Sequence, residues 1–260
     1  MYQLKPIEPV PPMQRDMDIL ANRLPSTDVL AGETITLAFD DGATMSMALS
    51  ADIVSWQFTD GDRTMRGEDN YDAVEMRAGV FFLDFAMAGG PFAFSHVIDR
   101  ENRRAITVWN ELIDVGGKTD LHELLRPSRL AGDAGEYAPI AQSRELLGRR
   151  IFCEYSREAA LEHLYVNSRT IVWQWLLRPP ELEFEVGIEA ASYWKIRDGL
   201  FLLTTRGEDP IGLTLLMDFD RKRNVGRLFG HGGFGIVDRR CGAKIMFLGE
   251  FTYPAGYEPG

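Results

Sequence analysis

The stretch LAGETITLAFDDGATMSMAL, residues 30–49, returns in altered form as LLGRRIFCEYSREAALEHLY, residues 146–165. Gly32 of the first stretch aligns with Gly148 of the second. Three further pairs of blocks follow in the same order: VSWQF with IVWQW, MRAGVFFL with IRDGLFLL, and VIDRENRRAI with LMDFDRKRNV. Because four pairs keep one order at nearly constant spacing, the sequence indicates an internal duplication.

Both copies have the pattern of short β-strands. Alternating apolar and polar segments end at turn signals, such as DDG, TDGD, AGG and DREN in the first copy and SRE, RDG and GEDP in the second. Some seven or eight strands per copy at hairpin spacing predict an antiparallel meander, and a meander removes its exposed edges by closing into a barrel. We therefore expect an all-β protein made of two tandem antiparallel β-barrels.

The segments outside the copies are expected to be an arm and a linker. The N-terminal arm contains MQRDMDILANRL, and the linker contains TDLHELL behind a capping residue, so a short helix is predicted in each. The predicted boundaries are as follows: arm 1–28, first barrel 29–113, linker 114–144 and second barrel 145–260.

Composition narrows the class of protein. Of 260 residues, 45% are hydrophobic, which is enough for a packed core, and the net charge of −11 with scattered basic residues argues against nucleic acid and anionic membrane as partners. Pro6 and Pro9 interrupt the N-terminus where a secretory signal needs an apolar run, so we expect a cytoplasmic protein. Cys153 and Cys241 stand alone, which predicts two buried thiols and neither a disulfide nor a metal site.

No cofactor motif is recognisable. The glycine-rich FGHGGFG lacks the Lys-Ser/Thr of a phosphate loop and has no helical pattern behind it. We expect neither a cofactor nor a metal, and the sequence leaves a homodimer open.

The duplication predicts which side chains point into each barrel. Residues two apart in a strand share a face, and Met45, Met47 and Leu49 form an apolar face in the first copy. Their equivalents in the second copy are Leu161, His163 and Tyr165, so His163 and Tyr165 should point inward while Glu162 points away. On the neighbouring strand, inward Phe39 becomes Tyr155. The first barrel should therefore be better filled, and the second should hold the larger pocket.

His163, Tyr155 and Tyr165 form the candidate catalytic set. A buried polar group without a partner costs about 1–3 kcal/mol, so they serve either as a satisfied internal network or as the polar end of a ligand cavity. In the second case His163 would transfer protons, and a tyrosine would donate to a developing oxyanion.

Other candidates are less distinctive. His96 shares an inward face with Phe92, Phe94 and Ile98, where the second copy is apolar throughout, and a core role competes with ligand binding. Arg206 lies near a strand end, where either a barrel rim facing an anionic ligand or a solvated hairpin accounts for it. Several aromatic residues would either fill the core or stack on a flat ligand: Trp56, Phe58, Trp173, Trp175, Tyr193 and Trp194.

The chain resembles the family of molybdenum cofactor biosynthesis protein F (MoaF). The run Glu-His-Leu-Tyr-Val-Asn-Ser and a later tryptophan match its C-terminal repeat, and residues 30–56 resemble its N-terminal repeat. The resemblance implies calycin-like barrels, similar to lipocalins, and adds Glu162, Asn167 and Trp173 to the ligand-binding candidates. Where the family tends to have Trp-Arg-Glu ahead of a proline, this chain reads Thr205, Arg206, Gly207 and Glu208.

Two functions of different classes follow from these patterns. One is a cofactor-independent acid–base enzyme, a lyase, isomerase or cyclase acting on an apolar or aromatic metabolite in a biosynthetic pathway. The other is a non-catalytic carrier or accessory protein of the MoaF type that binds such a molecule. The inward polar groups favour the first, and the absence of a nucleophile–base–orienter set in the sequence favours the second.

Overall fold

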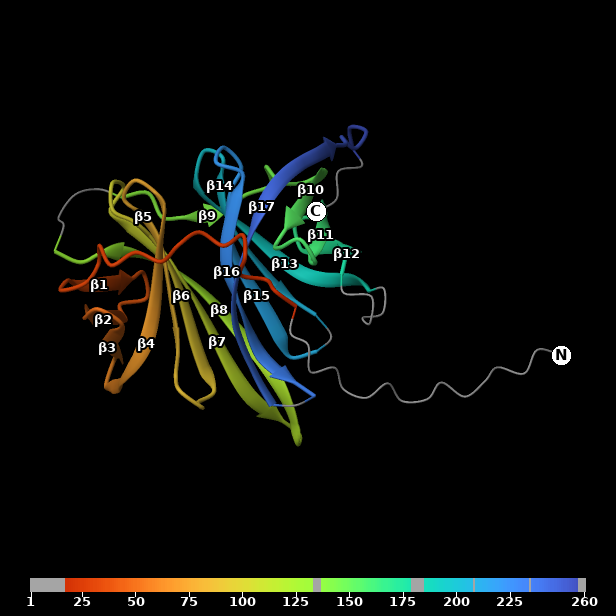
Figure 1. The fold of residues 1–260 in the computed structure, drawn as a ribbon. Helices are drawn as coiled ribbons and strands as arrows, with labels where there is room; N and C mark the ends of the chain where they lie inside the picture. Colours follow the sequence, from red (N-terminus) through yellow and green to blue (C-terminus); the bar gives the residue numbers. More distant parts are fainter. Residues whose placement is uncertain (1–16, 133–136, 179–184, 208, 234, 257–260) are drawn as a thin grey trace.

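The first barrel closes with eight antiparallel strands. The computed structural model describes residues 17–132, 137–178, 185–207, 209–233 and 235–256 (Figure 1). Barrel one follows chain order, and β8 returns to pair with β1. Its strands are β1 Thr34–Phe39, β2 Thr44–Leu49, β3 Ile53–Asp60, β4 Arg63–Arg77, β5 Val80–Ala86, β6 Phe92–Asp99, β7 Arg104–Val115 and β8 Lys118–Leu130.

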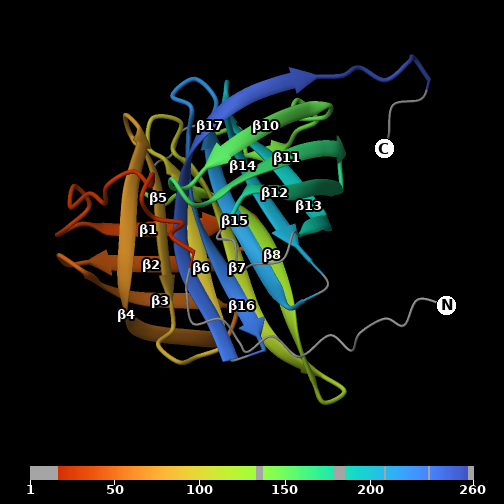
Figure 2. The same cartoon turned by 45° about the vertical axis from the view of Figure 1, so that its right-hand side comes forward.

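The second barrel repeats this architecture beside the first (Figure 2). Its sheet closes through the pairing of β12 with β13 and of β10 with β17, while short β9 adds to the outer side of β13. Its strands are β9 Ala141–Gln142, β10 Arg149–Glu154, β11 Ala160–Asn167, β12 Thr170–Leu177, β13 Val186–Arg197, β14 Leu200–Arg206, β15 Ile211–Asp218, β16 Arg223–Gly232 and β17 Gly235–Glu250. The predicted pair of tandem barrels is confirmed.

The two predicted helices are wrong, since the described residues contain no helix. TDLHELL lies in β8, because barrel one needs an eighth strand between β7 and β1, and this demand overrides local helix propensity. Barrel one thus runs to Leu130 rather than to residue 113. In the arm, residues 17–24 form local turns, such as the bond from Arg23 N to the Leu20 carbonyl, and they also bond to barrel two, through Asn22 N to the Tyr155 carbonyl and Gly242 N to the Ile19 carbonyl. Residues 13–16 of that predicted helix lie outside the described part of the chain.

The duplication is visible in the turns. Gly32 and Gly148 share left-handed φ angles of 85° and 81°, and a Cβ on Gly148 would meet the Phe251 carbonyl. Arg103 and Lys222 hold φ angles of 54° and 55° at equivalent turn positions, although neither is glycine. Equivalent sequence therefore produces equivalent backbone in both copies.

An apolar layer joins the two barrels. Sheet residues point alternately inward and outward, and here one outward face of each barrel is buried against the other. Its fully buried members come from both copies: Val74, Met76, Val80, Phe82, Val97, Ile106 and Val108 of barrel one, and Ile196, Leu200, Leu202, Leu216 and Val225 of barrel two.

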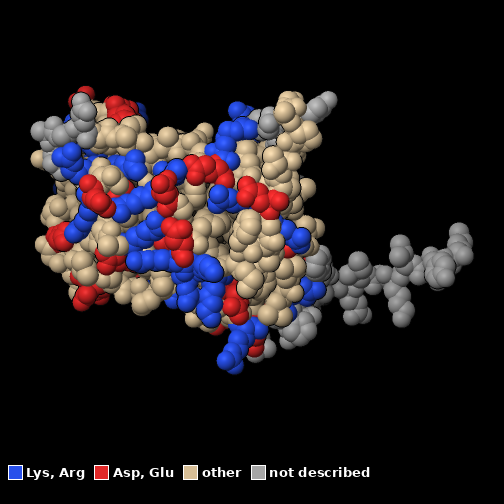
Figure 3. Space-filling model, turned by 90° about the horizontal axis from the view of Figure 1, so that it is seen from above, with Lys and Arg blue, Asp and Glu red and all other residues tan. Residues whose placement is uncertain are grey.

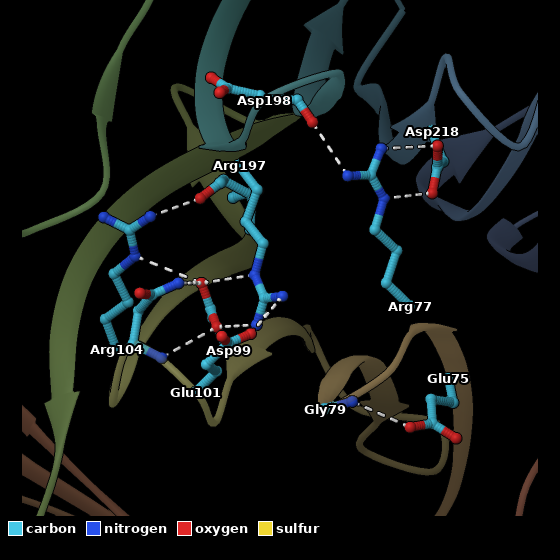
Figure 4. Close-up of polar contacts among 11 residues, drawn as sticks. Glu75, Arg77, Gly79, Asp99, Glu101, Arg104, Arg197, Asp198 and Asp218 are labelled. Atoms are coloured by element: carbon cyan, nitrogen blue, oxygen red, sulfur yellow. Dashed lines mark hydrogen bonds and ion pairs between the residues drawn. The ribbon is translucent and has the colours of Figure 1, made fainter.

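Two reciprocal ion pairs cross this interface (Figure 4). Arg77 of barrel one donates Nε and Nη2 to Asp218 of barrel two at 2.6 and 2.8 Å, and Arg197 of barrel two donates to Asp99 of barrel one at 3.2 and 2.6 Å. The arginines are repeat equivalents, as are the aspartates. The contact is therefore self-complementary, as in a two-fold dimer.

Local backbone geometry aims both arginines. The ladder between β4 and β5 shifts register between Glu75 and Arg77, and that between β13 and β14 shifts between Lys195 and Arg197. Such a bulge redirects the next side chain. The same device in both copies turns each arginine toward the opposite barrel.

The acids are buried yet charged. Asp218 is fully buried, and burial alone would raise the pKa of its carboxyl. Hydrogen bonds from Arg77 and from the amides of Arg221 and Asp220 outweigh burial, so the pKa of Asp218 lies below the ordinary 3.8. A lowered folded-state pKa means that the pair contributes stability above pH 3.8, and that this contribution is lost as the pH falls through the lowered value.

Charges on the outer surface are mixed. Figure 3 shows acidic and basic side chains interspersed on the face seen from above, without a broad field of one sign.

We predict that Arg77→Ala lowers the free energy of unfolding by about 3 kcal/mol, because it leaves the Asp218 carboxylate buried and unpaired. Urea unfolding at pH 7 measures the change. Asp198→Ala is the matched control: the Asp198 side chain is 98% exposed and pairs with Lys195, so its loss should change the stability far less than Arg77→Ala does. Equal effects of the two variants would contradict an interface held by the buried pair.

Candidate functional site

Each barrel contains an inward tryptophan held by a glycine and a carboxylate. Trp173 of β12 lies opposite Gly187 of β13, and a Cβ at Gly187 would stand 2.3 Å from the indole. The indole Nε1 donates to Oε1 of Glu189, two residues farther along β13, at 2.7 Å. Glycine is required here because the ring lies directly on the neighbouring backbone.

Barrel one repeats this arrangement. Trp56 lies opposite Gly67, where a Cβ would stand 2.8 Å from the ring, and its Nε1 donates to Oδ2 of Asp69 at 2.8 Å. The motif therefore predates the divergence of the copies and anchors the tryptophan in both. What differs between the barrels is the space in front of that ring.

In barrel one, aromatic rings fill that space. Trp56 packs against Phe85 and Phe94 with ring centroids 6.1 and 5.4 Å away, and Phe58 meets Trp109 edge-on at 4.9 Å. All five side chains are buried. Barrel one is thus closed by its own aromatic cluster.

In barrel two, the equivalents of the three packing rings are smaller. Thr205 stands where barrel one has Phe85, Leu213 replaces Phe94, and Leu228 replaces Trp109. The residues around this position face inward yet are only half-buried, whereas their barrel-one equivalents are buried. We call this set the mouth of barrel two: Trp173, Trp175, Ala191, Leu213 and Leu228.

Polar groups border the mouth. His163 lies opposite Trp173 across the strand pair, and its Nδ1 is 3.4 Å from the Tyr165 hydroxyl, which donates to Met217 Sδ at 3.3 Å. Tyr165 meets Tyr193 edge-on, and the Tyr193 hydroxyl donates to the Thr170 carbonyl at 2.9 Å. The strand register places His163 and Tyr165 inside, as the duplication predicts.

Burial keeps these groups neutral. Desolvation lowers the pKa of His163 from 6.5 to about 4 and raises the pKa of Tyr165 well above 10. At neutral pH the imidazole is therefore uncharged, and one of its nitrogens is free to accept a hydrogen bond.

Tyr155 is a core residue of the same buried cluster and forms no hydrogen bond to His163 or Tyr165. It is buried among Ile19, Cys153 and Cys241, and desolvation raises its pKa well above 10. Both cysteines are unpaired and buried, as predicted, and burial raises the pKa of Cys241 to about 12. They pack as small apolar residues.

Four predicted ligand contacts lie elsewhere. Glu162 points outward, where it pairs with Arg150 and accepts from Gln174, and Asn167 holds the β11–β12 turn by accepting from the Arg169 amide. Arg206 donates to the Leu121 carbonyl across the interface between the barrels. His96 is in barrel one, where its Nδ1 contacts Thr107 at 2.9 Å, and burial lowers its pKa to about 3.

The sequence reasoning missed Glu189. It stands on the inward face of β13, opposite Ile171, and is half-buried beside Trp173. The signal was present, because Gly67 and Asp69 in the first copy have the same spacing as Gly187 and Glu189 in the second. This glycine–acid pair falls between the aligned blocks, where the similarity of the two copies is weakest.

In the described part of the chain, no group of three or more His, Cys, Asp or Glu side chains is arranged to hold a metal ion. No helix there has the length and apolar character needed to cross a bilayer.

We predict that His163→Met, which restores the barrel-one residue, becomes more stable relative to the wild type as the pH falls from 7 to 5. The unfolded histidine binds a proton below pH 6.5 and the folded one only near 4, so the wild type loses roughly 2 kcal/mol at pH 5 that the variant keeps. Urea unfolding at both pH values gives the difference. His122→Gln, which removes an exposed histidine, is the control. If the free energy of unfolding changes equally with pH in the wild type and in His163→Met, His163 is not buried.

Two family models match the chain, one over each half. The MoaF N-terminal domain family matches residues 18–114, and the MoaF C-terminal domain family matches residues 140–251. A solved structure from Burkholderia vietnamiensis, named "putative beta-lactamase", is 21% identical and covers 42% of this chain and 100% of its own, with a TM-score of 0.32. No curated protein matches the chain.

Proposed function

The chain belongs to the MoaF family, and from this premise we propose that barrel two binds an apolar or aromatic small molecule at its mouth, while barrel one serves as the closed structural partner. A family and a fold do not specify a ligand, so the proposal rests on the site itself. Small barrels are wide enough inside to hold one such molecule.

The main support for this proposal is that barrel two has smaller side chains where barrel one has three aromatic rings. In barrel one, Phe85, Phe94 and Trp109 pack on the tryptophan–phenylalanine pair and exclude water. Barrel two keeps the anchored tryptophan and has a second one at Trp175, yet lacks all three packing rings. A flat ligand at the mouth would occupy the place that these rings hold in barrel one, and would bury the faces of Trp173 and Trp175.

The polar pair supports binding more than acid–base catalysis. A general acid or base works best with a pKa near the operating pH, whereas burial moves the pKa of His163 down to about 4 and that of Tyr165 up. Both groups can still direct a neutral hydrogen bond at a ligand. We therefore favour the carrier over the lyase, isomerase or cyclase, with His163 and Tyr165 as orienting groups.

We predict that Thr205→Phe/Leu228→Trp, which restores two rings of barrel one, lowers the affinity of barrel two for the neutral fluorophore N-phenyl-1-naphthylamine at least about tenfold. The added rings fill the space that the ligand needs, and tenfold corresponds to about 1.4 kcal/mol. Fluorescence titration measures the affinity, and near-ultraviolet circular dichroism confirms that the variant is folded. Leu228→Trp alone serves as the milder variant.

Gln57→Trp is the control, because it adds an aromatic ring at an exposed outward position of β3. It should leave the affinity unchanged within about twofold, since exposed strand positions tolerate aromatic residues. Wild-type protein that does not bind the fluorophore, or a filled variant that binds it as well as wild type, would refute the proposal. Chemical turnover of a ligand that is lost in His163→Gln at unchanged affinity would favour the enzyme instead.

A further inference from the structure

A carboxylate without a protein cation lies at the mouth of barrel two. Glu189 Oε1 accepts from Trp173 Nε1, and among the described residues neither a lysine nor an arginine forms an ion pair with it. The side chain is half-buried and faces the barrel interior. Beside Ile171, Trp173 and Gly207, such a charge favours a cation supplied from outside.

The barrel-one equivalent is satisfied internally. Asp69 Oδ2 accepts from Trp56 Nε1 at 2.8 Å, and its Oδ1 accepts from the Ala88 amide at 3.0 Å. Asp69 is buried behind the aromatic cluster. Both carboxylate oxygens of Asp69 therefore accept hydrogen bonds from the protein. Anchoring of Trp173 uses only Oε1 of Glu189, so its second oxygen and its negative charge remain for a ligand.

The two tryptophans beside Glu189 have the geometry of a cation site. The ring centroids of Trp173 and Trp175 are 6.4 Å apart, and their planes meet at 76°. A cation placed over the faces of two nearly perpendicular indoles would gain attraction from both rings, and the carboxylate bonded to the Trp173 indole would add direct charge attraction. His163, which lies opposite Trp173, is uncharged at neutral pH and does not compete for the carboxylate.

We infer that the ligand of barrel two is a cationic amine with an apolar or aromatic body, its ammonium group held between Glu189, Trp173 and Trp175. This inference rests on the proposed function, which places the apolar body where barrel one has its packing rings. The carboxylate then sets the order of affinity among molecules of the same shape: cations bind most tightly, uncharged molecules bind more weakly because they form no ion pair, and anions are repelled.

Three probes with one aromatic body test the charge preference. We would titrate 2-(1-naphthyl)ethylamine, 2-(1-naphthyl)ethanol and 1-naphthylacetate into the full chain by calorimetry at pH 7. The amine should bind at least about tenfold more tightly than the alcohol, and naphthylacetate should bind most weakly of the three. Glu189→Gln keeps an acceptor for Trp173 and removes the charge, so it should lower the amine affinity about tenfold and leave the alcohol within about twofold.

Asp69→Asn in barrel one is the matched control, and it should leave the amine preference unchanged. Equal affinity for amine and alcohol in the wild type, or tightest binding of naphthylacetate, would overturn the inference while leaving the proposed cavity intact. An amine preference that survives in Glu189→Gln would overturn the role of Glu189. Binding of none of the probes, N-phenyl-1-naphthylamine included, would overturn the proposed function together with the inference.

Discussion

The buried reciprocal pairs Arg77–Asp218 and Arg197–Asp99 constrain the whole molecule. Among the described residues, Asp218 finds its ion-pair partner, Arg77, only on the other barrel, and Arg197 of barrel two adds to Arg104 of barrel one around Asp99. Separating or sliding the copies would therefore leave Asp218 unpaired and break the Arg197–Asp99 contact. The bulges that aim the arginines precede the same hairpin in both copies. Since one outward face of each barrel is occupied by the other, a ligand could reach only the interiors and the remaining surface.

A joined pair of barrels lets one copy change while the other keeps its packing. Barrel one is filled by an aromatic cluster in close contact, of the kind that contributes strongly to stability. Barrel two has given up the three packing rings and carries polar groups at inward positions that are apolar in barrel one, such as His163 in place of Met47. Such losses destabilise a single small barrel, but the interface couples barrel two to a filled neighbour.

The duplication made much of this fold predictable, because an aligned copy shows which face of a strand is apolar. It placed His163 and Tyr165 inside and Glu162 outside without any contact information. It failed where tertiary demands override local signals: TDLHELL has helix propensity yet closes barrel one as β8. It also failed where the position of a side chain depends on contacts between the copies, as with Arg206, and where a residue falls between the aligned blocks, as with Glu189.

The central claim is that one barrel is closed by its own rings and the other is open at the equivalent place. Xenon enters apolar cavities and is readily located in crystals, so crystals of the protein pressurised with xenon test this claim directly. The account predicts xenon against Trp173 and Trp175 in barrel two, and none between Trp56 and Trp109 in barrel one. Xenon inside barrel one, with the mouth of barrel two solidly packed, would contradict it.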